Sequence, residues 1–187
     1  MRAFIAIELP LDIKNALVKI QDKLKTTLPK ISWVKPANLH LSLKFLGEIS
    51  LKQLKETQQI IAEIIKTSSP FEIKLETLGV FPNCRAARII WIGTNQPPRQ
   101  LKQLVDQLET KLLKIGLPEE QHPFRAHITL SRIKNPLIPS DLERGLDKVK
   151  NDCSDANLKF NTRGITLFQS VLGPGGPTYS ILKEAAF

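Results

Sequence analysis

An internal repeat with a period of 87 residues constrains the fold of this chain more than any other feature. The order strand, helix, histidine-bearing strand, helix, strand occurs twice. A repeat of this kind indicates duplicated units that bury a shared core. The sequence therefore predicts a single α+β domain, 1–187, with approximate halves 1–87 and 88–187. The same offset separates three residue pairs: His40 and His127, Phe4 and Trp91, and Phe81 and Phe168.

The hydrophobic pattern predicts how each half is built. Alternating apolar residues are typical of strands, and apolar residues three and four apart are typical of helices. We expect two antiparallel sheets, each flanked by helices and related by a pseudo-two-fold axis. A central cleft would lie between them. Ser50 and Ser140 are expected N-caps. Strands are expected over 2–9, 31–36, 39–47, 71–81, 88–94, 126–133, 158–172 (a strand or a strand pair) and, after a turn, to 187, and helices over 12–28, 51–66, 99–115 and 141–150.

Composition narrows the class of protein. Hydrophobic residues make up 42% and charged residues 24%, which is typical of a soluble globular protein. No apolar run approaches the roughly 20 residues of a membrane span. Cys84 and Cys153 have no metal-binding spacing and are too few for a disulfide scaffold, so a cytoplasmic location is expected. The 27 basic and 18 acidic residues give a formal charge of +9, which favours nucleic acid or phosphorylated substrates, or marks a lysine-rich surface.

Each predicted histidine strand carries a hydroxyl two residues after the imidazole. Because residues i and i+2 share a face of a strand, His40 lies beside Ser42 and His127 beside Thr129. Two imidazoles can act as base and acid near neutral pH, and two hydroxyls can donate to phosphate oxygens. This set suits displacement at a phosphodiester without a metal. A single histidine on a sheet is more often structural, so the argument depends on the pairing at the repeat offset.

The sequence resembles a known family. "HLSL" at 40–43 and "HITL" at 127–130 are similar to the paired H-x-[ST]-x motifs of the 2H phosphoesterases. "MRAFIAIELP", "WVKPANLHLSLKFLGEI", "GVFPN", "PFRAHITLSR" and "LFQSVLGPGGPTYSIL" resemble the RNA 2′,3′-cyclic phosphodiesterases, also called 2′-5′ RNA ligases. Three positions depart from the family pattern: Ser42 replaces the usual Thr, Ala126 a common Pro, and Cys84 lies in a usually Pro-bearing loop.

The resemblance implies a function and a set of roles. His40 would be the proton donor and His127 the proton acceptor, with Ser42 and Thr129 binding the phosphate and no cofactor or metal. Arg132 would bind phosphate or nucleotide, but its odd offset from His127 places it on the other face unless the strand twists or bulges. The reaction would open RNA 2′,3′-cyclic phosphate ends to 2′-phosphomonoesters, with 2′-5′ ligation in reverse. The expected partners are RNA ends, tRNA fragments among them, with no membrane and a monomeric chain.

Other residues have competing interpretations. Phe45 stacks on a base or belongs to the core, while Trp33 and Trp91 fit the core. "GPGGP" at 173–177 is a tight turn, since it lacks the lysine and helix of a phosphate-binding loop. The alternative function is a non-catalytic RNA- or nucleotide-binding module that uses the same basic cleft. His122 reads as a loop residue, and three arginines either rim the cleft or are solvated: Arg85, Arg88 and Arg125.

Overall fold

The computed structural model describes residues 1–155 and 158–187, without the side chains of 151–155. Four α-helices lie in the described chain: α1 (Leu11–Lys25), α2 (Leu51–Lys66), α3 (Arg99–Leu113) and α4 (Pro139–Asp155), with two 3-10 turns, η1 (Pro36–Asn38) and η2 (Cys84–Ala86). The strands are β1 (Arg2–Glu8), β2 (Ser32–Trp33), β3 (His40–Glu48), β4 (Glu72–Lys74), β5 (Thr77–Phe81), β6 (Ile89–Gly93), β7 (His127–Arg132), β8 (Lys159–Asn161), β9 (Gly164–Gly173) and β10 (Gly176–Ala186).

An antiparallel sheet of order β10-β9-β1-β3-β7-β6-β5 runs through the molecule, with β2 paired to β7 and a small β4-β8 sheet beneath. The two predicted sheets are the halves of this larger sheet, joined where β3 meets β7. Leu41 pairs with Ile128 at this junction, and Ile73 pairs with Phe160 in the small sheet. Both pairs join residues 87 apart, so the pseudo-two-fold axis passes through both contacts. The predicted α+β architecture is confirmed.

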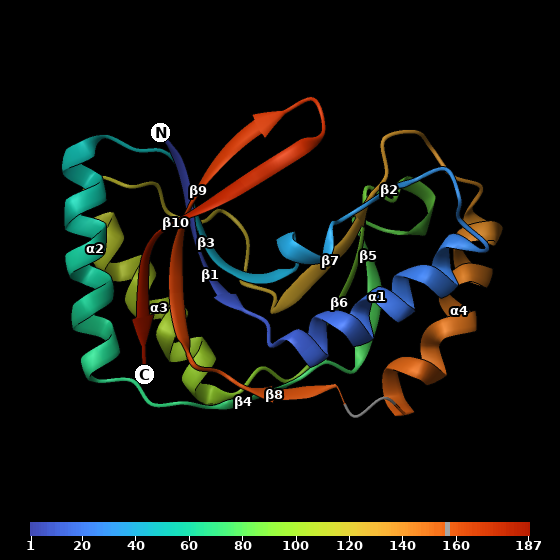
Figure 1. Ribbon diagram of the computed structural model, residues 1–187, viewed down its shortest axis with the longest axis horizontal. Coiled ribbons are helices and arrows are strands. Elements are labelled where there is room, and N and C mark those ends of the chain that lie inside the picture. The colour runs from blue at the N-terminus through green and yellow to red at the C-terminus, as the bar shows by residue number, and fades with distance from the viewer. Residues whose placement is uncertain (156–157) are drawn as a thin grey trace.

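The two halves of the sequence exchange strands. β5 belongs to the first half but pairs with β6, and β9 belongs to the second half but pairs with β1. Helices α2 and α3 pack together on one side of the molecule, and α1 and α4 pack together on the other (Figure 1). Each lobe therefore combines elements from both halves. The resulting core is continuous across the lobes, from Ile5 and Leu41 to Ile92 and Ile128.

Local chemistry explains where elements begin and end. The predicted cap at Ser50 is confirmed, since its hydroxyl accepts from the Gln53 amide while the Gln53 side chain accepts from the Ser50 amide. The predicted cap at Ser140 is wrong: α4 begins at Pro139, a residue suited to the first helical position, and extends to Asp155. Helix α1 stops at Lys25, before the predicted Leu28, because the following amides close tighter turns.

The single strand predicted over 71–81 is also wrong, because the chain changes partners in its middle. The Leu75 amide donates to Leu158 beside β8, whereas the next amide, that of Glu76, donates to Gly93 at the end of β6. One segment thus supplies strands to two sheets. This exchange carries β5 from the base of the molecule into the opposite lobe.

Candidate active site

The two histidine strands meet at the centre of the sheet, where β3 and β7 run antiparallel on either side of the pseudo-two-fold axis. In both strands the histidine and the hydroxyl residue are half-buried, and the intervening residues, Leu41 and Ile128, are fully buried. The predicted alternation is therefore confirmed at the level of the backbone. Its consequence is that both imidazole–hydroxyl pairs face away from the core, toward one shared surface.

His40 is held at both ring nitrogens. Its Nδ1 lies 2.8 Å from the peptide oxygen of Asn38, and its Nε2 lies 3.0 Å from the Ser42 hydroxyl oxygen. A carbonyl oxygen only accepts, so Nδ1 carries the hydrogen. In the neutral ring, Nε2 then has the lone pair and the Ser42 hydroxyl donates to it. The predicted pairing of His40 with Ser42 is a direct contact.

His127 has the matching anchor. Its Nδ1 lies 2.7 Å from the peptide oxygen of Arg125, which is 87 residues beyond Asn38. Nδ1 therefore donates here too, and Nε2 of the neutral ring is the basic atom. Both imidazoles thus have the same orientation relative to their strands, set by backbone carbonyls that the sequence pattern could not reveal.

Aromatic rings surround each imidazole. The His40 ring centroid lies 4.9 Å from that of Phe4 and 5.4 Å from that of Tyr179 on β10. The His127 ring lies edge-on to Phe81 at 5.1 Å and to Trp91 at 6.2 Å. These rings remove the imidazoles from water while leaving little freedom of rotation. Among the described residues, no ring beside His127 matches Tyr179, so the two histidines have different surroundings.

Burial lowers the pKa of both histidines. The pKa of His40 falls from 6.5 to about 4, chiefly through desolvation, while its bond to the Asn38 carbonyl opposes the shift. The positive charges of Lys14 and Arg132, and His127 itself, lower it further. The pKa of His127 is also lowered by burial, with a smaller opposing effect from its carbonyl partner. Burial thus favours the neutral form of both rings.

A β-bulge places Arg132 on the same face as His127. The β6–β7 register passes from Ile90–Ser131 to Trp91–Thr129, so Leu130 has no partner on β6 and the alternation shifts by one residue. Arg132 is exposed, and its charge acts on both His40 and Tyr179. It adds to the burial that lowers the pKa of His40, and it opposes the burial that raises the pKa of Tyr179. The sequence allowed Arg132 to face the same side as His127 only if the strand twisted or bulged. The bulge is present, so Arg132 lies on the same face as the two histidines.

A matching β-bulge occurs in the first lobe. The β1–β3 register passes from Ile5–Lys44 to Ala6–Ser42 and skips Leu43, which is 87 residues before Leu130. Phe45 consequently pairs with Phe4 on the cleft face and is 56% exposed. The interpretation of Phe45 as a core residue is therefore wrong. Phe45 and Arg132 occupy equivalent places, so one lobe presents a ring where the other presents a cation.

One of the three repeat pairs does not mark equivalent positions. Ala6 pairs with Ser42, whereas Trp91 pairs with Thr129, so the structural counterpart of Trp91 is Ala6 and not Phe4. The indole lies over Gly79, where an added Cβ would approach the ring to 2.5 Å. Trp91 therefore belongs to the wall of the cleft and not to the core as predicted. Trp33, by contrast, packs against the core as expected.

The remaining candidates lie at the edges of the site or away from it. Arg125 is exposed, with its guanidinium 5.7 Å from the centre of the Phe81 ring. Arg88 donates to the peptide oxygen of Lys134. Arg85 is exposed in η2, and His122 is exposed in a loop. Among these four, only Arg125 contacts a ring that packs on a histidine.

Potential ligand groups for a metal are sparse. No cluster of three or more His, Cys, Asp or Glu side chains that could hold an ion occurs among the described residues. Within the same part of the chain, no helix is long and apolar enough to cross a bilayer. The polar side chains described above at the centre of the sheet are two imidazoles, two hydroxyls and a guanidinium.

Comparison with known proteins identifies the family. The profile of the LigT-like phosphoesterases matches residues 7–91 and again residues 92–179, which together span most of the chain. The protein belongs to the LigT-like phosphoesterase family. The resemblance inferred from the paired H-x-[ST]-x motifs is thereby confirmed.

Individual members of the family match over nearly their whole length. A Methanocaldococcus jannaschii protein named RNA 2′,3′-cyclic phosphodiesterase is 34% identical over 185 residues, covering 98% of this chain and 99% of the relative. A protein of the same name from Archaeoglobus fulgidus is 32% identical, covering 98% of each. A Thermus thermophilus crystal structure covers 100% of this chain and 97% of its own at a TM-score of 0.82 and 26% identity.

Escherichia coli LigT, solved in complex with 3′-AMP, gives a TM-score of 0.77 at 28% identity, covering 99% of this chain and 97% of LigT. That LigT-like protein binds a nucleotide. These likenesses confirm the duplicated fold and support the prediction of a phosphodiesterase. The comparisons do not assign roles to individual residues, and the roles proposed below rest on the geometry described above.

Proposed function

We propose that the chain hydrolyses RNA 2′,3′-cyclic phosphate ends to 2′-phosphomonoesters by general acid–base catalysis. The observation that carries this proposal is the pair of imidazoles with identical carbonyl anchors, at residues 87 apart, facing one cleft. The names of the relatives support the same substrate class. The substrate would be RNA, tRNA fragments included, handled by a monomer in the cytoplasm.

The two imidazoles divide the proton transfers. In an in-line displacement the nucleophile and the leaving oxygen lie on opposite sides of phosphorus, so an acid and a base must flank the phosphate. His127, neutral and with a basic Nε2, takes a proton from the attacking water. His40 donates a proton to the 3′-oxygen as the bond from that oxygen to phosphorus breaks. The product carries a 2′-phosphate and a free 3′-hydroxyl.

The low pKa of His40 requires that the substrate itself supply the charged form. A phosphodiester carries one negative charge, and a charge about 4 Å away at an effective dielectric of about 20 contributes about 4 kcal/mol. This energy corresponds to a rise of about three in pKa. The pKa of His40, about 4 in the empty cleft, would therefore approach 7 once the phosphate is bound. Substrate binding and protonation of His40 are coupled in this mechanism.

The hydroxyls and Arg132 hold the phosphate. When His40 becomes charged, Nε2 gains a hydrogen, and Ser42 is released to donate to a non-bridging oxygen. Thr129 does the same from the opposite lobe. Arg132 adds a cation where negative charge grows in the transition state. Run backwards with a 5′-hydroxyl in place of water, the same groups would form a 2′-5′ linkage.

The test is turnover of a cyclic-phosphate dinucleotide, with products separated against authentic 2′- and 3′-phosphate standards. His40→Ala and His127→Ala should each lower the rate at least about 10²-fold, the scale of acid–base catalysis. His122→Ala is the matched control and should be nearly silent, because its side chain is exposed in a loop. A 3′-phosphate product would reverse the roles of the two histidines. Binding without turnover would favour the non-catalytic module.

A further inference from the structure

Gln21 is a polar side chain inside the core, and no part of the mechanism above uses it. It lies on α1 and is only 2% exposed. Its Nε2 donates to the peptide oxygen of Leu130 and to that of Val34, each at 2.9 Å. Peptide oxygens only accept, so the amide nitrogen faces them and both of its hydrogens are used. The buried amide therefore holds two separate segments of the main chain together.

One of these two oxygens belongs to the bulge of β7. Leu130 is the residue that has no partner on β6. Its peptide oxygen accepts from the Val34 amide at 3.0 Å as well as from Gln21. Val34 follows β2, which pairs with β7 through Trp33 and Ser131. Gln21 thus joins α1, the end of β2 and the bulged residue at one point.

The bulge buries a polar group that a regular strand would leave in the cleft. With regular alternation from His127, Ser131 would lie on the cleft face and Arg132 would point toward the core. The bulge reverses both placements. Ser131 is fully buried, with no hydrogen-bond partner for its hydroxyl among the described residues, and Arg132 is exposed. A buried hydroxyl without a partner is unfavourable, so other contacts must hold the bulge, and the two bonds from Gln21 are such contacts.

The first lobe supports this interpretation, because a helix also holds its bulge. The bulge at Leu43 turns Lys44 inward, where its Nζ donates to the Glu109 carboxylate on α3 at 2.7 Å. Lys44 is only 4% exposed. The residue 87 positions after Gln21 is Leu108, the neighbour of Glu109 on α3. Helix α3 therefore holds one bulge through an ion pair, and α1 holds the other through an amide.

We propose that Gln21 is a positioning residue, which keeps Arg132 on the cleft face by fixing the bulge at Leu130. The inference rests on the proposed function, in which Arg132 binds the phosphate. Without the Gln21 amide, the Leu130 oxygen keeps the Val34 amide alone of these two donors, and β7 can relax toward regular alternation. The guanidinium then faces the cleft for part of the time, and the affinity for a phosphate falls in proportion to that fraction.

The experiment is a double-mutant cycle on the binding of 2′-AMP, measured by calorimetry at pH 7. Arg132→Ala should weaken binding at least about tenfold, the scale of a hydrogen bond to a charged group. Gln21→Met keeps the length of the side chain and removes its donors. It should weaken binding about threefold, the result expected if the guanidinium faces the cleft about a third of the time. In the Arg132→Ala background its effect should be less than about twofold, because it acts through that arginine.

A spectroscopic measurement gives a second readout that a loss of stability does not change. The charge of Arg132 is among those that lower the pKa of His40. The pKa of His40, followed by NMR, should therefore rise in Gln21→Met and in Arg132→Ala. It should rise no further in the double variant than in Arg132→Ala.

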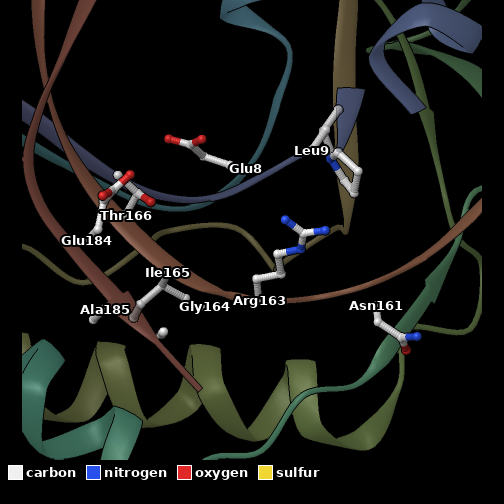
Figure 2. A pocket seen from close by; sticks show the side chains of 11 residues that line it. Glu8, Leu9, Asn161, Arg163, Gly164, Ile165, Thr166, Glu184 and Ala185 are labelled. Atoms are coloured by element: carbon white, nitrogen blue, oxygen red, sulfur yellow. The ribbon is translucent and has the colours of Figure 1, made fainter. Parts of the chain in front are cut away.

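Two control variants match these substitutions. Gln58 on α2 donates its side-chain amide to the Leu182 peptide oxygen at 3.2 Å, so Gln58→Met removes a similar bond between a helix and a strand. Arg163 is exposed and lies with Glu8 and Glu184 in the lining of a cavity of about 290 Å³ (Figure 2). The residues that line this cavity include no histidine, so Arg163→Ala removes the same charge away from both imidazoles. Both controls should keep the wild-type affinity for 2′-AMP.

The outcomes separate this inference from the function on which it rests. Wild-type binding by Gln21→Met would overturn the inference and leave the proposed function standing. A loss of the same size with and without Arg132 would show that Gln21 acts through another group, which also overturns it. If Gln21→Met does not fold, Gln21→Asn takes its place in the cycle, because it keeps the amide but withdraws it from both oxygens by one methylene. Wild-type binding by Arg132→Ala would overturn the inference together with the phosphate contact, whereas turnover of the cyclic-phosphate dinucleotide tests hydrolysis independently.

Discussion

His40 should make the stability of the protein depend on pH. The folded protein protonates this ring only near pH 4, whereas the unfolded chain protonates it near 6.5. As pH falls through this window, the unfolded state binds a proton that the folded state does not, so the free energy of unfolding decreases. Between pH 7 and pH 5 the loss from His40 is about 2 kcal/mol, and it approaches about 3 kcal/mol at pH 4.

The perturbation that isolates this effect is His40→Gln, which keeps a polar side chain but removes the titration. Urea unfolding at pH 7 and pH 5 gives the free energy for each variant. The pH-dependent loss should be smaller in His40→Gln than in the wild type by about 2 kcal/mol. His122→Gln alters an exposed histidine and should keep the full wild-type loss. An identical loss in wild type and His40→Gln would refute the reasoning that burial lowers the pKa of His40.

Three further results are expected. Calorimetry of 2′-AMP binding at pH 6, in buffers of different ionisation enthalpy, should show proton uptake by the wild-type protein. If the His40→Gln variant takes up no proton on binding, the proton belongs to the His40 ring. If the variant still takes up a proton, the proton belongs to another group. Activity should survive excess EDTA, because two imidazoles suffice for the proton transfers; loss on chelation, restored by a divalent ion, would contradict this. Affinity for longer RNA should fall as salt rises, since a formal charge of +9 favours phosphate contacts; salt-independent affinity would indicate a small nucleotide as the ligand.

The sequence was sufficient to predict the backbone arrangement of the site, because the patterns that indicate it are local and occur twice. Alternation around His40 and His127 specified which side chains share a face, and the 87-residue offset predicted that the two strands face each other. The cap at Ser50 followed from a hydroxyl and a glutamine three residues apart. The alternation and the cap each depend on a few neighbouring residues, and the repeat offset can be read without knowing any distant contact.

What the sequence could not specify depends on pairing between distant strands. The bulges at Leu43 and Leu130 appear only in the register, and they decide that Phe45 and Arg132 face the cleft. Tyr179 reaches His40 because the β9–β10 hairpin carries it there, with its Pro177 oxygen accepting from the Asn38 side chain. The exchange of β5 between lobes has the same origin, a change of hydrogen-bond partner at Glu76.

The fold is symmetric around the two histidines but the surrounding side chains are not, which bears on the different roles proposed for His40 and His127. The backbone anchors at Asn38 and Arg125 give both rings the same tautomer, so the fold alone leaves them interchangeable. The surrounding side chains remove this equivalence. Phe4, Phe168 and Tyr179 lie near His40, whereas Phe81 and Trp91 lie near His127. Glu8 lies opposite His40 where a glycine lies opposite His127.

These differences act on the charged form of each ring. His40 has the deeper burial and the neighbouring cations Lys14 and Arg132, so its protonated form is costly until an anion enters the cleft. An imidazole that becomes charged only when a phosphate is present is suited to be the acid, since its proton is gained together with the substrate. His127 has one cationic neighbour, Arg125, and is the base in the proposed mechanism. Under that proposal, the direction of the reaction follows from side chains that the duplication did not preserve.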